Sequence, residues 1–204
     1  TQKSQAFELL SNLYLYTVGM NPRRVRLDTN YIAAQDRELS RTLKLAHVNY
    51  GEGFNPEPAA LPQLKRFLAK HHDMDLQLST VTPEQLSNQR AAIMTVTEGA
   101  KLSDGQATAI RRWIEGGGTL WMDAVTGSKE AVNAMQAMRD KIFPDSVQRS
   151  VPPSSPIISG EGLATGYEND AVRYRTYLLR RLGAMTSPGL GVITVDGRPG
   201  LVVS

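Results

Sequence analysis

A helix followed by a buried strand is the clearest hydrophobic pattern of the chain, and it lies between residues 102 and 128. Ser103 and Gln106 have the spacing of a capping box, in which two side chains bond free backbone groups at a helix start. Glycines 116–118 predict a left-handed helix end and a reversal, and the apolar run after them predicts a strand over 119–122. The helix itself is indicated by an apolar stripe of Ala107, Ile110, Trp113 and Ile114.

Strand and helix patterns alternate over residues 43–143. Pro62 fits only the first turn of a helix, so we expect that helix to begin near Ala59. Thr82 and Gln85 are expected to cap a short helical turn. Four strands joined by helices, with right-handed crossovers, predict an α/β fold, a three-layer sandwich with a parallel sheet in flavodoxin-like order. The other patterns behind this prediction are the buried runs Leu43–Val48 and Ala91–Val96, the alternating edge strand with Leu76 and Leu78, and the helix from Ser128 to Phe143 closed by Pro144.

The C-terminal part of the chain has a different pattern. Asp196-Gly197 stands within the alternating stretch 191–203, which predicts a C-terminal β-hairpin with a two-residue turn. Residues 151–166 are rich in Pro, Ser and Gly and lack periodicity. We therefore expect a surface loop there, over one edge of the sheet.

The N-terminal residues predict a separate element. An apolar stripe predicts a helix over about residues 4–18, packed on the α/β domain or on a neighbouring chain, because such a stripe is costly to leave in water. An extended segment over 22–28 is expected to follow it. We divide the chain into an N-terminal helix with its linker, residues 1–40, and an α/β domain, residues 41–204. The stripe consists of Phe7, Leu10, Tyr14 and Val18.

Composition and charge narrow the functional classes. The chain has 204 residues, of which 41% are hydrophobic, and a formal net charge of +3, which is too small to indicate a nucleic-acid binder. The lack of cysteine excludes disulfides, thiolate metal sites and a cysteine nucleophile, and leaves the compartment open between the cytoplasm and a periplasmic or exported location. No apolar run approaches the roughly 20 residues that span a bilayer. Because the chain starts without methionine, we interpret it as a processed protein or an excised fragment.

Three acidic residues form the main candidate site. Glu52, Glu98 and Asp123 each follow a predicted strand, and the carboxyl ends of parallel strands form the edge where such folds bind ligands. The three could hold a divalent cation or act as acid and base; alternatively they cap helices and bond loop amides, which requires no ligand. No cofactor is predicted, the expected partner is a small molecule or a protein, and the oligomeric state stays open. The expected ligand-binding residues are Asn49, Tyr50, Glu52, Glu98, Asp123 and Thr126.

Two other polar groups have ordinary structural interpretations. The loop Gly51-Glu52-Gly53 could cradle a phosphate, but Pro56 stands where the dinucleotide fingerprint has its third glycine, so we expect a tight turn. Neighbouring residues on a helix diverge by about 100°. This divergence favours a role at a helix end over a metal site for the cluster of His71, His72, Asp73 and Asp75.

Hydroxyl, imidazole and guanidinium groups complete the candidates. Thr126 and Ser128 follow the fourth strand without the glycines of a nucleophile elbow, so we expect Ser128 to be a helix N-cap. His47, inside the first strand, is expected to be a core or edge histidine with a hydrogen-bond partner. A solvated face is the ordinary interpretation, and phosphate or acidic-partner binding the alternative, for Arg173, Arg175, Arg180 and Arg181.

Several motifs stand in an order that matches a known bacterial family. They are the Tyr50–Gly53 loop with its Asn-Pro, the helix LPQLKRFL, the stretch LSDGQATAIRRWIEGGGTLWMDA, the FPD at Phe143–Asp145, and VRYRTYLLRRLG followed by VDGR. Through them the chain from Leu45 to Ser204 resembles the family called domain of unknown function 4159. That family is grouped with the class I glutamine amidotransferase-like fold, so the resemblance implies this fold here.

The chain departs from that family in two places. Many members carry cysteine after the strand-end aspartate, where this chain has Ala124, Val125 and Thr126, and many have His-Pro where it has Ser155-Pro156. Since amidotransferase chemistry needs a thiol, we expect no glutaminase activity and favour a non-catalytic ligand-binding or protein-interaction module. The alternative is a metal-dependent or acid/base hydrolase, possibly acting on glycans, built on the three acids. A helix like ELLSNLYLY often closes the family's domains, so the resemblance implies that residues 1–30 are the tail of a preceding module.

Overall fold

The computed structural model of the chain describes residues 32, 37–125, 127–162 and 189–204. The chain divides into two compact units, Thr1–Arg37 and Glu38–Ser204, and the α/β fold belongs to the second. The predicted N-terminal helix, the extended segment after it, the four late arginines and Thr126 lie outside the described residues.

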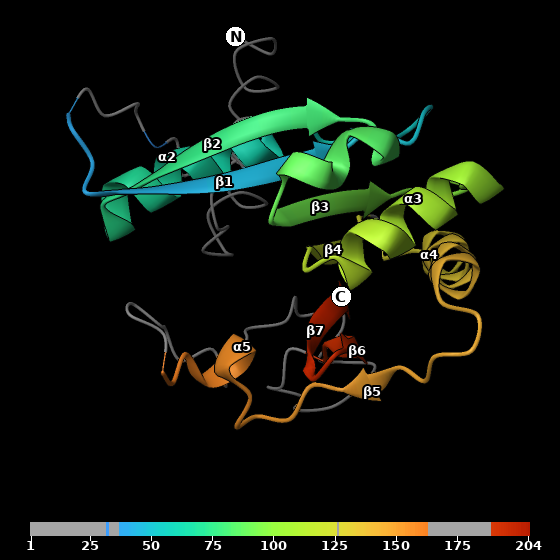
Figure 1. Cartoon of the computed structure of the whole chain (residues 1–204). Helices are drawn as coiled ribbons and strands as arrows, with labels where there is room; N and C mark the ends of the chain where they lie inside the picture. The colour runs from blue at the N-terminus through green and yellow to red at the C-terminus, as the bar shows by residue number, and fades with distance from the viewer. Residues whose placement is uncertain (1–31, 33–36, 126, 163–188) are drawn as a thin grey trace, which may run out of the picture. The chain divides into compact units, whose positions relative to one another are not determined.

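A seven-stranded sheet forms the centre of the second unit (Figure 1). Its strands are β1 (Arg41–Val48), β2 (Met74–Val81), β3 (Ala91–Val96), β4 (Thr119–Ala124), β5 (Arg149–Ser150), β6 (Gly191–Val195) and β7 (Arg198–Val203). They lie in the order β2-β1-β3-β4-β7-β6-β5. The first five in this order are parallel, which confirms the pairing expected of the four early strands. The whole sheet is mixed rather than parallel, because β6 is antiparallel to both β7 and β5.

The antiparallel part follows from the hairpin at Asp196-Gly197. Both residues have positive φ, 50° and 76°, as a two-residue turn of the primed type requires. Such a turn can join only antiparallel neighbours, so β6 must run against β7. The predicted C-terminal hairpin is confirmed, and its attachment beside β4 turns a parallel sheet into a mixed one.

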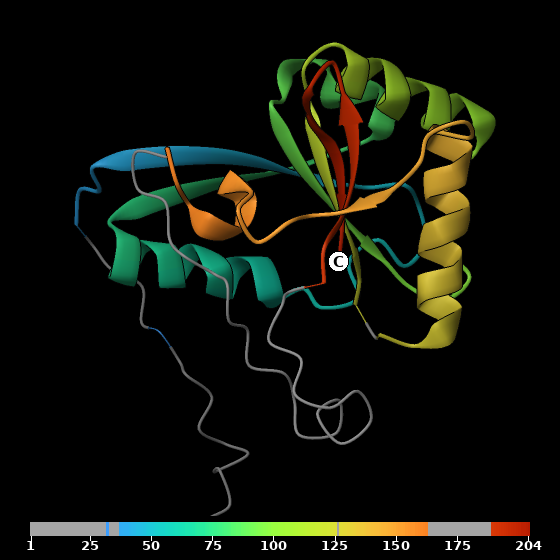
Figure 2. The same ribbon diagram turned by 90° about the horizontal axis from the view of Figure 1, so that it is seen from below.

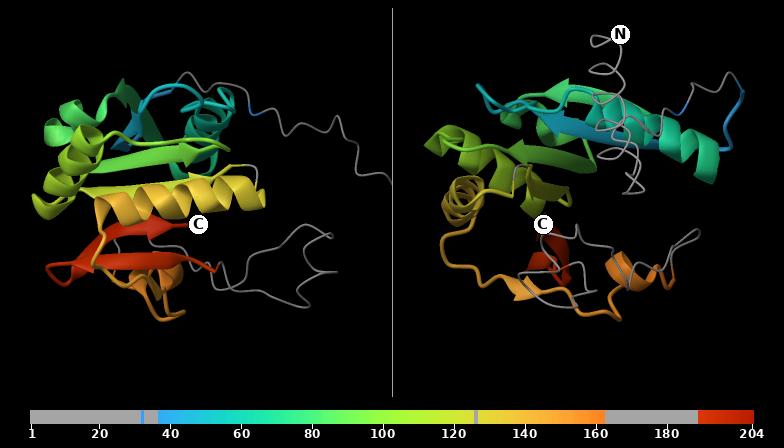
Figure 3. Two further views of the ribbon diagram at one scale, coloured as in Figure 1. Left: turned by 90° about the vertical axis from the view of Figure 1, so that its right-hand side faces the viewer. Right: turned by 180° about the vertical axis from the view of Figure 1, so that it is seen from behind.

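Helices cover both faces of the sheet. They are α2 (Ala60–His72), α3 (Asp104–Glu115), α4 (Lys129–Ile142), the short α5 (Pro156–Ser159) and the 3-10 helix η1 (Pro83–Asn88). Helix α2 packs on β2 on one face, which we call the back face, whereas η1, α3 and α4 pack together on the other, the front face (Figures 2 and 3). Because these strands are parallel, the loops that follow them lie at one edge of the sheet.

The caps of the front-face helices are those expected from the sequence. Gln106 N donates to Ser103 Oγ over 3.1 Å, and Ser103 N donates to Gln106 Oε1 over 2.9 Å, which confirms the capping box. Ser128 accepts from Ala131 N at 3.1 Å, so its predicted N-cap role is also confirmed. At the end of α3 the C-cap Gly116 has φ −73° and Gly117 has φ +110°, so the positive φ falls within the glycines expected to reverse the chain.

The main core lies on the front face. Alternate residues of the parallel strands point to it, since successive side chains of a strand face opposite ways. Each parallel strand except β2 therefore contributes a row of apolar side chains to the front face, and three helices bury these rows. Its members include Ala46, Met94, Met122 and Leu201 of the sheet, Leu86 of η1, Ile110 of α3 and Met135 of α4.

The back face is buried under α2 and, at the other end of the sheet, under α5. Ile158 of α5 packs in a second cluster with Val151, Leu190 and Val202. The expectation of a surface loop over residues 151–166 is therefore wrong for its first part, because one turn of helix inserts an isoleucine against the sheet. The low periodicity of a four-residue helix hides it in the sequence.

Other back-face positions remain partly exposed. Trp121 of β4 is 37% exposed, and Leu43 of β1 is 42% exposed. Phe67 and Leu64 of α2 are exposed to a similar extent. Parallel strands are usually buried on both faces, so the two sides of this sheet are covered unequally by the described residues.

Candidate functional site

The loop over residues 49–54, which we call the Tyr50 loop, follows β1 at the carboxyl edge of the sheet. Gly51 and Gly53 have φ of 127° and 76°, and Asn49 Oδ1 accepts from Gly51 N at 3.0 Å. A Cβ on Gly53 would lie 2.7 Å from Thr97 Oγ1. The tight-turn interpretation is confirmed, and the second glycine lets the loop approach the residue after β3.

Tyr50 anchors this loop from inside. Its one hydroxyl hydrogen is shared between the carbonyl oxygens of Thr95, at 2.9 Å, and Gly53, at 3.2 Å. Gln106 Nε2 in turn donates to the Tyr50 carbonyl at 3.2 Å. Burial raises the pKa of the Tyr50 phenol, so the hydroxyl keeps its proton and its donor role at neutral pH. Tyr50 is therefore a structural anchor at the base of the site.

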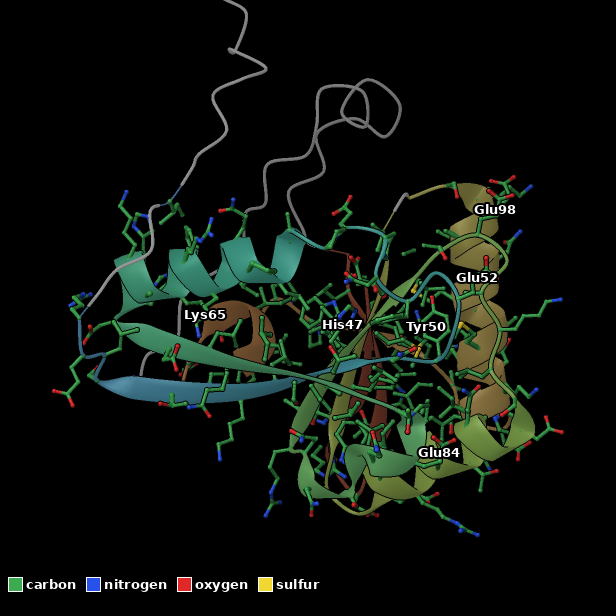
Figure 4. The ribbon with its side chains drawn as sticks, turned by 90° about the horizontal axis from the view of Figure 1, so that it is seen from above. His47, Tyr50, Glu52, Lys65, Glu84 and Glu98 are labelled. Atoms are coloured by element: carbon green, nitrogen blue, oxygen red, sulfur yellow. The ribbon has the colours of Figure 1, made fainter. Side chains whose placement is uncertain are left out.

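Beside the Tyr50 loop lies a cavity of about 400 Å³, which we call the rim pocket. Glu52 and Glu98 both line it, one from the Tyr50 loop and one from the loop after β3 (Figure 4). Thr97 and Lys101 also line the pocket. Two acidic residues and one basic residue thus line a space of the size that small-molecule sites have. The complete lining is Tyr50, Glu52, Gly53, Thr97, Glu98, Gly99, Ala100 and Lys101.

Asp123 does not line the rim pocket. The fourth strand runs on to Ala124, so Asp123 lies within β4 rather than after it, in register with Thr95. Its Oδ1 atom accepts from the hydroxyl of Ser204 at 2.7 Å. The expectation that three acids share one crevice is met for two of them. Asp123 is separated from the other two because β4 ends at Ala124, two residues after the apolar run 119–122 from which its end was predicted.

His47 takes part in the site from beneath the Tyr50 loop. The residue is 5% exposed, its Nε2 atom lies 3.1 Å from Thr95 Oγ1, and its ring centroid lies 5.2 Å from that of Phe54. Thr95 Oγ1 donates onward to the Phe54 carbonyl. Burial lowers the pKa of His47, an effect that the Phe54 carbonyl partly offsets. The expectation of a core histidine with a partner is confirmed, but the link to the loop was not predicted.

In the sequence, the only signal for the contact between His47 and Thr95 is the alternation of side chains along β1 and β3, which places both on one face of the sheet. Positions 47 and 95 both fall on the back face, where His47 pairs in register with Ile93. Strand partners cannot be chosen from one sequence, however, and Phe54 lies in a loop without periodicity. The polar pair became visible only with the strand order.

The other polar clusters have structural surroundings. His71 and His72 end α2 beside Phe67, with ring centroids 4.7 and 5.3 Å from the phenylalanine ring. Over the described ranges, no group of three or more acidic or histidine side chains is arranged to hold a metal ion. In the same residues, no helix is long and apolar enough to cross a membrane. A second groove, of about 430 Å³, lies between η1 and α3.

Of two comparisons with known proteins, one gives a match. A search of curated proteins finds no match. The family model described as a domain of unknown function, DUF4159, matches residues 44–199, a range that begins within β1 and ends within β7. The chain therefore belongs to the DUF4159 family.

Proposed function

We propose that this domain is a non-catalytic binding module that takes a small polar ligand in the rim pocket. The observation that carries the proposal is the convergence of Glu52 and Glu98, from two loops, on one cavity. The Tyr50 loop that presents Glu52 is held by side-chain hydrogen bonds to β3, so the pocket is built before any ligand arrives. A preformed site loses less entropy when it binds.

The lining indicates the chemistry of the ligand. Glu52 and Glu98 can accept hydrogen bonds from ammonium or hydroxyl groups, and such charge-assisted bonds are the stronger kind. Lys101, another residue of the lining, can donate hydrogen bonds, and the hydroxyl of Thr97, which donates to the Gly53 carbonyl at 3.4 Å, can accept one. A hydroxylated ligand with one positive charge, such as an amino sugar, fits this set of groups.

The scaffold supports the same proposal. The parallel order β2-β1-β3-β4-β7 is the order of flavodoxin-like sheets, which supports an amidotransferase-like scaffold. Amidotransferase chemistry requires a thiolate nucleophile, and the chain has no cysteine. We therefore expect ammonia release from glutamine to equal that of a buffer blank, and steady release above the blank would contradict this expectation.

Binding can be tested by NMR titration with glucosamine, with uncharged glucose for comparison. We expect amide shifts confined to residues 50–53 and 97–101, and weaker shifts with glucose. Glu52→Gln and Glu98→Gln should each weaken glucosamine binding about tenfold or more, since each removes a charge-assisted bond. Glu84→Gln is the matched control, because Glu84 lies on η1 away from the rim pocket (Figure 4). Equal loss in all three variants, or no shifts at the pocket, would reject the proposal.

An acid/base hydrolase is the second candidate. The observation that favours it is that two glutamates line one cavity, because glycosidases act with two Asp or Glu side chains. Hydrolysis of a panel of chromogenic glycosides, lost in Glu52→Gln and in Glu98→Gln, would support it. Absence of turnover in a protein that binds glucosamine would leave the binding module as the function.

A further inference from the structure

The Tyr50 loop is joined to the sheet by a short chain of hydrogen bonds that starts at His47. Thr95 has one hydroxyl hydrogen, and it is donated to the Phe54 carbonyl. The Thr95 oxygen can therefore accept from His47, which assigns the hydrogen of the neutral ring to Nε2. In this tautomer every link of the chain from His47 through Thr95 to the loop is satisfied.

The same contacts disfavour a charged ring. His47 is 5% exposed and covered by the Phe54 ring, so an imidazolium there would lose most of its hydration. A second N–H would have to share the Phe54 carbonyl with Thr95, and this contact offsets the effect of burial only in part. Burial accordingly lowers the pKa of His47. Water can reach the ring once the segment that carries Phe54 moves away.

The groups around His47 come from several elements. Its register partners are Thr80 of β2 and Ile93 of β3, neither of which ionises. Within the described part of the chain, no ion pair involves His47. Among the titratable groups on the neighbouring elements, Tyr50 and Glu52 belong to the loop, and Asp123 of β4 accepts from Ser204. Lys65 of α2 pairs with Asp75 of β2 at 3.1 Å. Helix α2 also carries Arg66, Lys70, His71 and His72.

We propose that His47 makes the rim pocket acid-sensitive: the ring is neutral while the Tyr50 loop covers it, and protonation of the buried ring favours a state in which the loop has moved off β3. Glu52 leaves the pocket with the loop, so the cavity that it forms with Glu98 is lost. The loss of ligand rests on the proposed function, whereas release of the loop does not.

Release of the loop is tested without any ligand. Amide hydrogen exchange of residues 51–54, expressed as protection factors over about pH 4.5 to 7.5, is compared with the imidazole titration of His47 by NMR. Protection should fall with the midpoint of His47, and this fall should be absent in His47→Gln, whose amide nitrogen can still donate to Thr95. Protection that stays unchanged through the His47 titration, or a fall retained in His47→Gln, would overturn the proposal.

Two further variants separate the switch from a general loss of packing. Thr95→Val keeps the shape of the residue and removes the middle link, so protection of residues 51–54 should be low at every pH. His71→Gln removes an exposed histidine at the end of α2, and its profile should match that of the wild type. A Thr95→Val protein with wild-type protection would show that the link does not hold the loop.

The effect on binding is measured with glucosamine in the same pH range. If glucosamine binds only when the loop is closed, the pKa of His47 must be lower in the complex than in the free protein. Thermodynamic linkage then requires the affinity at low pH to be about tenfold lower for each unit of difference between these two pKa values. Absence of glucosamine binding at neutral pH would contradict the proposed function. The exchange data would still decide whether protonation of His47 releases the loop. Affinity that is independent of pH while protection falls would overturn the coupling between loop and pocket.

Discussion

The front and back faces of one sheet differ in how completely they are buried. On the front face η1, α3 and α4 enclose a continuous core, and Leu120 of β4 is fully buried there. On the back face Trp121, the next residue of the same strand, is 37% exposed. Adjacent residues of one strand therefore contribute very differently to stability, because the helices above each face decide what a side chain can bury.

The largest expected effect is a matched pair of leucine substitutions. Leu120→Ala removes a fully buried side chain and should lower the free energy of unfolding by about 3 kcal/mol. Leu43→Ala acts on a back-face residue that is 42% exposed and should cost less than about 1 kcal/mol. Urea denaturation of both variants measures the difference. Equal losses would mean that the back face is buried as completely as the front.

A smaller effect is expected at the helix caps. Ser103→Ala removes the side-chain acceptor at the start of α3 and should lower the free energy of unfolding by about 1 kcal/mol. Ser103→Thr retains an acceptor and should lose much less. Helix α2 on the back face has no side-chain cap at Ala59, so Ala59→Gly should change stability by only a few tenths of a kcal/mol. Thermal unfolding compares the three variants.

Acid should destabilise the fold through the back-face histidine. The folded state lowers the pKa of His47 from the ordinary value of 6.5, so the unfolded chain binds the proton more readily. Stability from this group is complete above pH 6.5 and is lost as the pH falls through the lower, folded pKa. Urea midpoints against pH should show this decline in the wild type and much less of it in His47→Gln. An identical decline in both proteins would assign it to other groups.

The smallest expected effect is spectroscopic, because the two tryptophans report the two faces separately. Trp113 of α3 is buried on the front face, where its Nε1 atom donates to the Gln89 carbonyl at 2.8 Å. Trp121→Phe leaves Trp113 as the only tryptophan and should show weak acrylamide quenching. Trp113→Phe leaves Trp121 and should show strong quenching. Similar quenching in the two variants would mean that the back face is covered in solution.

Part of the candidate site could be predicted from the sequence because it depends on local rules. Glu52 and Glu98 follow parallel strands, and such strands end at the same edge, so both were expected there. Asp123 was misplaced because an apolar run does not show where a strand ends. The same limit applies to His47 and Thr95, whose proximity depends on β1 lying beside β3.

The sequence by itself determined the elements whose signals lie within a few residues. The capping box of α3, the N-cap at Ser128 and the Asp196-Gly197 turn are local hydrogen-bonding or dihedral requirements, and all three are present. Only the tertiary structure decided which strand lies beside which, and with it the mixed sheet, the insertion of Ile158 and the unequal faces. The physical reason is that these features depend on surfaces brought together from distant parts of the chain. A hydrophobic pattern predicts that a residue is buried, but it does not identify the element that packs against it.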